Sequence, residues 1–258
     1  SMLPTVVVLA PQTPGISDRL RHLEQLARTV GEVRFTHVDV DLPLEQIIAA
    51  CGNTRVILLA LSTAQIVPLA ARLPELKLVQ IFSAGSDWLD VAGLAALGVQ
   101  VADNGGANAV PVAEHAIALM LSLCRRLEEL SRSIRNGEWH ADYRQHPGAF
   151  HTLAGKRVGI VGLGRIGSRV ARRLATWECE SVFHDIRTFD DEYLRACGAR
   201  PLPFDALLAT SDIVTLHVPL NHTTRHLVGR RALGLMRPES MLINTCRGSV
   251  VDETALIS

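Results

Sequence analysis

The stretch Arg157-Val-Gly-Ile-Val-Gly-Leu-Gly-Arg-Ile-Gly167 decides the fold of the second half of the chain. Its apolar beginning predicts a short strand over 157–161, and the amphipathic sequence 165–176 predicts a helix. A second strand is predicted over 181–184 and runs into Asp185, 18 positions after Gly167. A strand, a Gly-x-Gly-x-x-Gly turn, a helix and a strand that ends at an acidic residue form the dinucleotide-binding fingerprint. The alternative is a structural glycine turn with a helix-capping aspartate.

Each glycine of the fingerprint has a physical reason. Gly162 permits a tight turn, Gly164 lets a pyrophosphate approach the backbone, and Gly167 lets the helix pack closely on the strand. The helix N-terminus, around Arg165 and Ile166, offers N–H groups and a partial positive charge to phosphates. This half of the chain is therefore expected to be a Rossmann domain.

The acidic residue indicates which dinucleotide binds. Asp185 would accept hydrogen bonds from the adenosine ribose, and its carboxylate would repel a 2′-phosphate. NAD is therefore expected as the cofactor, and NADP is disfavoured. Arg187, two residues later, tempers this preference without reversing it.

The first hundred residues alternate strand patterns with helix patterns. Strands are predicted over 5–10, 33–38, 55–61, 77–82 and 99–102, and helices over 16–29, 44–51, 64–73 and 88–97, the last capped by Asp87. This alternation implies βαβ units and a parallel sheet. Because the segment 104–108, Asn-Gly-Gly-Ala-Asn, interrupts the pattern, we expect an α/β protein with two doubly wound parallel-sheet domains, 3–103 and 104–258.

A long apolar pattern follows the break. It predicts one helix over about 110–130, which is apolar on nearly every side over 116–123. Such a helix must be buried on several faces. A central core helix and a helix at a subunit interface both satisfy this requirement.

Composition excludes several classes of protein. The 258 residues carry 26 basic and 26 acidic side chains, whereas nucleic-acid binders show a basic excess. No apolar run approaches the roughly 18 residues of a membrane span. The five cysteines show no paired spacing, so neither a metal site nor disulfides are expected. With Ser1-Met2 interpreted as a cloning remnant and no signal peptide predicted, we expect a cytoplasmic protein.

Two polar residues are predicted at strand ends in the second domain. Arg247 follows a strand predicted over 240–245, and ligands bind at the carboxyl ends of parallel strands. Its guanidinium can bind a carboxylate or stabilise charge on a carbonyl oxygen. Pairing with Asp252 is the structural alternative. For His217, contact with a cofactor edge and simple strand-end packing are equally suitable interpretations.

Five segments, in this order, together resemble the D-isomer-specific 2-hydroxyacid dehydrogenase family. The resemblance covers nearly the whole chain from residue 5, and the last segment is the most specific. The segments are 83–90 (Ser-Ala-Gly-Ser-Asp-Trp-Leu-Asp), 111–115 (Pro-Val-Ala-Glu-His), 162–167 with Asp185, 217–224 (His-Val-Pro-Leu-Asn-His-Thr-Thr) and 244–252 (Asn-Thr-Cys-Arg-Gly-Ser-Val-Val-Asp).

The resemblance implies a flavodoxin-like substrate domain and a Rossmann NAD domain, with a small 2-hydroxy or 2-keto acid bound in the cleft between them. It implies hydride transfer with Arg247 as the catalytic arginine, substrate-binding amides from Ala84 and Gly85, and a homodimer built on the helix near 110–130. The further cofactor contacts that it implies come from Val112, His217, Val218, Pro219, Thr224, Thr245 and Cys246.

The family also uses a proton-carrying histidine oriented by a glutamate, both beyond the arginine signature. This chain ends eleven residues after Arg247, within a helix that Asp252 is expected to cap. None of its ten histidines has an evident glutamate partner. The resemblance therefore implies a C-terminally truncated chain with little or no dehydrogenase activity. A fragment, a natural truncation and a site completed by another group or chain are all compatible with this ending.

Two rival functions stay open. One is a non-catalytic NAD-binding scaffold or sensor, as in the corepressor branch of the same superfamily. The other is a hydrolase of the adenosylhomocysteinase kind, against which the loop at 83–87 and the Arg247 signature argue. Within the dehydrogenases these motifs do not distinguish glyoxylate or hydroxypyruvate from phosphoglycerate or phosphite as substrate.

Overall fold

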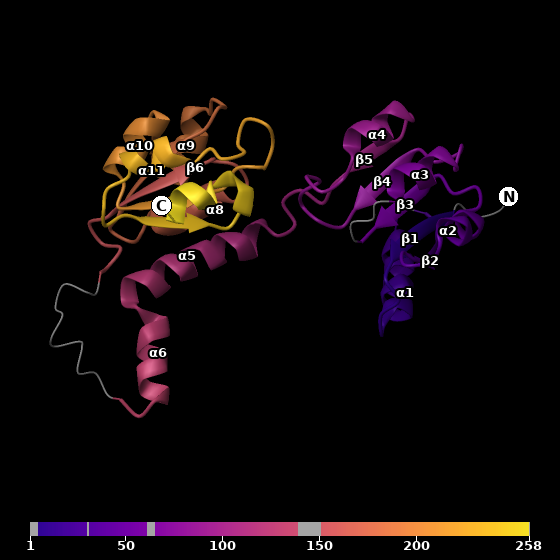
Figure 1. Ribbon diagram of the computed structural model, residues 1–258, viewed down its shortest axis with the longest axis horizontal. Helices are drawn as coiled ribbons and strands as arrows, with labels where there is room; N and C mark the ends of the chain where they lie inside the picture. Colours follow the sequence, from indigo (N-terminus) through magenta and orange to yellow (C-terminus); the bar gives the residue numbers. More distant parts are fainter. Residues whose placement is uncertain (1–4, 30, 61–64, 139–150, 258) are drawn as a thin grey trace. The chain divides into compact units, whose positions relative to one another are not determined.

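The computed structural model describes residues 5–29, 31–60, 65–138 and 151–257. The chain divides into two compact units, Ser1–Ala107 and Asn108–Ser258, called unit 1 and unit 2 below. Each unit contains one five-stranded sheet in which every strand pair is parallel (Figure 1). The predicted α/β class with two parallel sheets is confirmed.

Unit 1 has the strand order β2-β1-β3-β4-β5, which is the flavodoxin-like order 2-1-3-4-5. Its strands alternate with helices along the chain, as the apolar patterns predict. The elements are β1 (Thr5–Ala10), α1 (Ile16–Ala27), β2 (Arg34–Asp39), α2 (Leu44–Cys51), β3 (Val56–Leu59), α3 (Ile66–Ala71), β4 (Leu78–Ile81), α4 (Val91–Ala96) and β5 (Gln100–Ala102).

The central strand β1 is buried on both faces. Val8 and Ala10 pack with Ile16 of α1, whereas Val7 and Leu9 pack in a core that includes residues of α2, α3 and α4. Successive side chains of a strand point to opposite faces, so a strand covered on both sides needs a continuous apolar run. The run of six apolar or β-branched residues in β1 meets this need.

The helix predicted from Trp88 begins three residues later than expected. Asp90 is the residue that caps α4, because its Oδ1 accepts a hydrogen bond from the amide of Gly93 at 2.8 Å. The prediction that Asp87 caps this helix is wrong. Two aspartates stand near the start of the same apolar pattern, and only the tertiary structure selects between them.

Unit 2 has the strand order β10-β9-β6-β7-β8. Its helices lie on both faces of the sheet, which is the doubly wound arrangement. The elements are α5 (Ala109–Arg125), α6 (Leu127–Arg135), β6 (Arg157–Val161), α8 (Gly167–Leu174), β7 (Glu180–His184), α9 (Asp191–Cys197), β8 (Ala199–Pro201), α10 (Phe204–Thr210), β9 (Ile213–Leu216), α11 (Arg230–Leu235), β10 (Met241–Asn244), a 3-10 turn (Gly248–Val250) and α12 (Glu253–Ile257).

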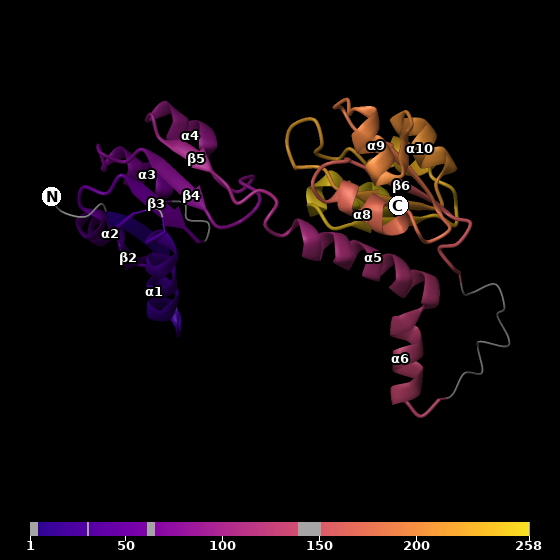
Figure 2. The same ribbon diagram turned by 180° about the vertical axis from the view of Figure 1, so that it is seen from behind.

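The two faces of this sheet have separate cores. Val158 and Ile160 of β6 pack with buried residues of α5 and α8, and Figure 2 shows these two helices on the same side of the sheet. On the other face, Val214 and Leu216 of β9 pack with residues of α10 and α11. The carboxyl edge of the sheet between these layers carries the loops described below.

The single helix predicted near 110–130 is instead two helices. Arg126, at φ 48° and ψ 43°, separates α5 from α6, which turns away from the line of α5 (Figure 1). The prediction of one helix is wrong for a tertiary reason. The carbonyl of Cys124 accepts a hydrogen bond from the amide of His151 at 2.9 Å, so the returning chain takes the acceptor that a continuous helix would use.

Within the described part of the chain, no helix combines the length and the hydropathy that a membrane crossing requires. The same residues also contain no group of three or more His, Cys, Asp or Glu side chains placed to hold a metal ion.

Candidate cofactor and substrate site

The carboxyl edge of the unit 2 sheet contains a topological switch point. After β6 the chain continues to β7 on one side of the sheet, and β9 later pairs with β6 on the other side. The loops that follow β6 and β9 therefore leave adjacent strands in opposite directions. Ligands of open α/β sheets bind in the crevice formed at such a point.

The glycine loop, residues 162–167, lies at this point and has no space for two further side chains. Gly162 has φ 94°, and a Cβ atom on it would lie 2.6 Å from the carbonyl oxygen of His217. A Cβ atom on Gly167 would lie 2.0 Å from the carbonyl oxygen of Gly162. The loops after β6 and β9 thus meet backbone to backbone, and α8 begins directly against the end of β6.

Gly164 differs from the other two glycines because its outer side is nearly open. The nearest atom to a Cβ there is Nη2 of Arg187, at 3.4 Å, the far end of a flexible side chain. Arg165 beside it is exposed, and Ile166 is half-buried. The loop therefore forms a cradle that leaves room for a phosphate group above its backbone, beside the N-terminus of α8.

Asp185 follows β7 and is tied to the glycine loop. Its Oδ2 accepts a hydrogen bond from the amide of Leu163 at 2.8 Å, and its Oδ1 accepts one from the amide of Arg187 at 2.9 Å. Burial acts to raise the pKa of Asp185, but these bonds and the Arg187 guanidinium outweigh it, so the pKa is lowered. The group is therefore an ionised acceptor beside the cradle.

An aromatic cluster supports this loop, and the sequence patterns do not reveal it. Tyr193 of α9 donates a hydrogen bond to the carbonyl of Leu163 at 3.1 Å. Its ring stacks on Phe189 with centroids 5.0 Å apart. Only the fold brings residues of α9 to the glycine loop, so no local signal could have identified them.

His217 and Thr245 stand side by side at the ends of β9 and β10, one residue beyond the paired Leu216 and Asn244. The Nε2 atom of His217 lies 2.9 Å from Oγ1 of Thr215, and burial lowers the pKa of His217 to about 4. Nδ1 of His217 and Oγ1 of Thr245 are buried without a hydrogen-bond partner in the described structure. Such orphaned polar atoms are costly unless a ligand or water satisfies them.

The loop that begins at His217 is shaped by its own polar side chains. Val218 is half-buried and Pro219 is exposed. The hydroxyl of Thr224 donates to the carbonyl of Pro219 at 2.6 Å and accepts from the amide of Asn221 at 2.9 Å. Thr224 therefore holds the loop together in this structure, whatever it contributes to a ligand.

Arg247 lies three residues beyond β10, at the same edge of the sheet. Asn244 fixes the turn before it, because its Nδ2 donates to the Arg247 carbonyl at 2.9 Å and its Oδ1 accepts from the Cys246 amide at 3.1 Å. The Arg247 guanidinium donates to the Cys246 carbonyl at 2.8 Å, and burial raises the pKa of the Cys246 thiol. Asp252 caps α12 by accepting from the amide of Ala255, as its position predicts.

The remaining predicted site residues lie elsewhere in the chain. Ala84 and Gly85 follow β4 in unit 1, where the Ser83 hydroxyl donates to the Gly85 carbonyl at 2.9 Å. Val112 is half-buried in the first turn of α5 in unit 2. The structure thus brings the glycine loop, Asp185, the loop after β9 and Arg247 to one sheet edge, and places the two proposed substrate amides in the other unit.

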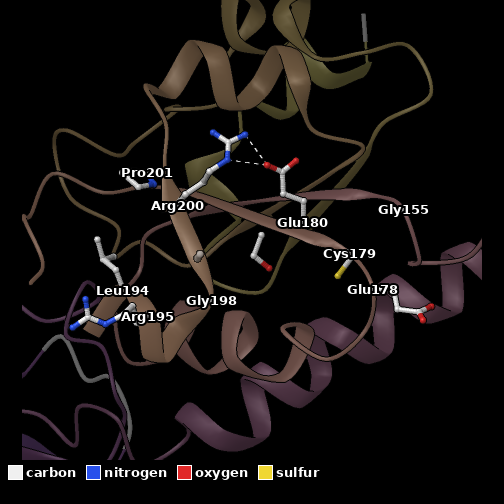
Figure 3. A pocket seen from close by; sticks show the side chains of 11 residues that line it. Gly155, Glu178, Cys179, Glu180, Leu194, Arg195, Gly198, Arg200 and Pro201 are labelled. Carbon is white, nitrogen blue, oxygen red and sulfur yellow. Dashed lines mark hydrogen bonds and ion pairs between the residues drawn. The ribbon is translucent and has the colours of Figure 1, made fainter. Parts of the chain in front are cut away.

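A pocket of about 800 Å³ lies away from this edge (Figure 3). It is lined by residues at the beginning of β7, in β8 and near the end of α9, and it contains none of the predicted site residues. Arg200 and Glu180 are paired beside it. The pocket is open to solvent, and both acidic and basic side chains line it.

Comparison with known proteins identifies the domain. Residues 117–258 match the family model of the D-isomer specific 2-hydroxyacid dehydrogenase NAD binding domain. The chain belongs to this family. The NAD-binding domain of the family therefore coincides with the part of unit 2 that carries the cradle, Asp185 and Arg247.

Family members of known function and structure are similar over long segments. Glyoxylate reductase of Thermococcus litoralis is 38% identical over 187 residues, which cover 71% of this chain and 56% of that protein. Glyoxylate reductase of Pyrococcus furiosus is 31% identical over 229 residues, covering 88% and 68%. The structure of Aquifex aeolicus D-lactate dehydrogenase with NAD and lactic acid has a TM-score of 0.78 at 26% identity, covering 97% of this chain and 72% of that chain.

This chain matches only part of the length of these relatives. The matches to three glyoxylate reductases span 56%, 54% and 55% of those proteins. The activity of a whole family member is therefore a proposal for this chain.

Proposed function

We propose that the protein is an NAD-dependent oxidoreductase of small D-2-hydroxy or 2-keto acids. The observation that carries the proposal is the arrangement at one sheet edge. There the glycine cradle follows the carboxyl end of β6, and the ionised Asp185 follows that of β7. The guanidinium of Arg247 comes from the loop after β10. Unit 2 is proposed as the cofactor domain and unit 1 as the substrate domain.

The residues at the edge fit a dinucleotide. The open side of Gly164 and the N-terminus of α8 suit a pyrophosphate, and Asp185 suits the adenosine ribose. The orphaned atoms of His217 and Thr245 offer a polar contact further along the same edge. We propose that Val112, Val218, Pro219, Thr224 and Cys246 line the cofactor as in the family. When bound, NAD supplies the hydride acceptor of the reaction.

The substrate contacts are proposed on both units. The Arg247 guanidinium would hold the C2 oxygen or the carboxylate with forked hydrogen bonds and stabilise charge that develops on that oxygen. The amides of Ala84 and Gly85 would hold the carboxylate. Glyoxylate and lactate are named for relatives, and both are small acids with an oxygen on C2, which fits this class of substrate.

Proton transfer needs a group with a pKa near neutrality. His217 does not suit this task because its pKa is about 4. The rings of His37 and His184 contact the carbonyl oxygens of Ala10 and Leu202, and neither is held by a glutamate in these contacts. We therefore propose that the 258-residue chain binds the cofactor well and turns substrate over slowly.

The test is a paired measurement on the 258-residue chain verified by mass. NADH binding is followed by nicotinamide fluorescence, and turnover is measured with glyoxylate, pyruvate and hydroxypyruvate. We expect saturable binding and slow turnover, with Arg247→Gln lowering the turnover by about 100-fold or more and leaving NADH affinity within about threefold. Absence of NADH binding would overturn the function. Fast turnover would overturn the assignment of slow proton transfer, and binding without any turnover would favour the scaffold alternative.

We also propose that the protein forms a homodimer through α5 and α6. Leu123, Leu127 and Ile134 are each about half exposed, at 49%, 51% and 51%, and α6 has no buried residue. Large exposed apolar side chains on neighbouring helices are typical of a subunit contact. Leu127→Glu should shift the mass measured by light scattering from dimer to monomer. An unchanged mass would exclude this face.

A further inference from the structure

Arg187 is held over the cofactor cradle from two sides. Its Nε donates to Oδ1 of Asp185 and its Nη2 to Oδ2, each at 3.3 Å. The guanidinium carbon also lies 5.1 Å from the centre of the Phe189 ring, within the range of a cation–π contact. Because this guanidinium is paired with Asp185, the residue proposed for the adenosine ribose, the cation stands at the adenosine end of the proposed dinucleotide site. Its Nη2 is also the nearest atom to the open side of Gly164.

This placement changes the charge of the adenosine subsite. The Asp185 side chain is only 7% exposed, whereas that of Arg187 is 58% exposed, so the cation is the group that an incoming ligand meets first. A lone carboxylate at this position rejects a 2′-phosphate by repulsion. Here the carboxylate is paired, and the site as a whole is neutral.

The guanidinium also retains donors for a second anion. A guanidinium carries five N–H groups in a planar fork, and Asp185 uses Nε and Nη2. Within the described residues, no other acceptor is bonded to this side chain. A phosphate monoester can therefore bind the outer side of the fork while Asp185 holds the inner side.

We infer that Arg187 makes the adenosine subsite accept a 2′-phosphate, so that NADPH binds within about tenfold of NADH. This inference rests on the proposed function and extends it to a second dinucleotide. Arg187 is the specificity-determining residue, and Phe189 positions it. Removal of the guanidinium leaves the carboxylate with its two amide hydrogen bonds but without a neutralising cation, which restores the repulsion of a 2′-phosphate. The proposed contact of the NADH ribose with Asp185 stays.

The experiment compares equilibrium binding of NADH and NADPH to the full chain by nicotinamide fluorescence. Arg187→Ala is compared with Arg195→Ala, which removes an exposed arginine from α9 of the same unit, beside the pocket of Figure 3. We expect Arg187→Ala to weaken NADPH binding by about 10- to 100-fold and to change NADH binding by less than about threefold. Arg195→Ala should change neither.

A salt titration provides an independent readout. The NADPH affinity of the wild type should fall more steeply with salt than that of Arg187→Ala, because salt screens the exposed contact between guanidinium and phosphate. Arg187→Lys should retain part of the NADPH affinity. A wild-type preference for NADH above about 100-fold that Arg187→Ala leaves unchanged would overturn the inference. Failure of both dinucleotides to bind the wild type would overturn the proposed function itself.

Discussion

Gly167 is the first residue of α8, and a methyl group there would overlap the carbonyl of Gly162. Gly167→Ala should therefore lower the free energy of unfolding by about 1–3 kcal/mol and weaken NADH binding, because the cradle must open to relieve the overlap. Urea denaturation and fluorescence titration measure the two effects. Gly234→Ala is the matched control: it lies in α11 with nothing within 4 Å of its Cβ position, so it should be neutral or stabilising. Equal losses in both variants would contradict the packing argument.

His217 gives the chain a defined response to acid. Its folded pKa of about 4 lies below the ordinary value of 6.5, so below that value the unfolded chain binds the proton first. As the pH falls from 6.5 to 4, protonation of His217 in the unfolded chain should lower the free energy of unfolding by up to about 1.4 kcal/mol for each pH unit. Above pH 6.5 the residue should have no effect on the pH dependence of stability.

Urea denaturation across this pH range checks the response of His217. His217→Gln should flatten the slope, whereas His222→Gln, which changes an exposed histidine of the same loop, should leave it. A slope that persists in His217→Gln would assign it to another group.

At the scale of single residues, a role could be predicted from the sequence where it depends on neighbouring residues in the chain, and not where it depends on a distant segment. The glycines and Asp185 could be placed from the sequence because a tight turn and a strand end are local requirements. Tyr193 and Phe189 could not, since their role depends on α9 folding back onto the glycine loop. Asp87 and Asp90 compete for one cap, and local pattern alone favoured the wrong one.

At the scale of elements, Glu180 joins three strands of the unit 2 sheet. Its carboxylate accepts hydrogen bonds from Arg157 of β6 at 2.6 Å and from Arg200 of β8 at 2.6 Å and 2.8 Å. Hydrogen bonds from these two arginines lower the pKa of Glu180. The ionised Glu180 carboxylate therefore stabilises the folded state at pH values above its unfolded pKa of about 4.3. This contribution is lost as the pH falls through the folded pKa of Glu180.

Glu180→Gln should accordingly lower the free energy of unfolding by about 0.5–1 kcal/mol at neutral pH, the small value reflecting a carboxylate that is 40% exposed. The difference from wild type should shrink as the pH falls below the unfolded pKa of about 4.3. Glu178→Gln, an exposed neighbour at the same sheet end, is the control and should show no such pH dependence. A difference that grows on acidification would refute the bridging role.

The break between α5 and α6 could not be predicted from the sequence pattern. The apolar run over 116–124 contains neither glycine nor proline, so nothing local ends the helix. The break coincides with left-handed Arg126 and with a long-range contact, in which the amide of His151 binds the carbonyl of Cys124, 27 positions earlier. The helical spacing of apolar residues carries no information about a contact between residues so far apart in the chain.

At the scale of the whole molecule, the two parallel sheets were predictable because each strand is short, apolar and followed by a helix pattern. The two units have separate cores, which leads to a prediction about their stability. NADH at 100 times its dissociation constant should stabilise unit 2 by about 2.7 kcal/mol and leave unit 1 unchanged.

Peptide-resolved hydrogen exchange in a urea series measures both units in one sample. Peptides from β6 to β10 should gain protection when NADH is added, and peptides from β1 to β5 should not. Gly167→Ala, with its disturbed cradle, should reduce the gain. Equal protection of both units would show that they unfold as one.

The left-handed residue Arg126 has a mechanical consequence. The nine residues of α6 form a rigid arm of roughly 13 Å, and one pair of backbone dihedrals sets its direction. A rotation of about 10° at that pivot displaces the far end of the arm by about 2 Å. Ile134 is exposed and lies close to that end. A small rotation at the end of α5 would therefore displace Ile134 much further than it displaces the first turn of α6.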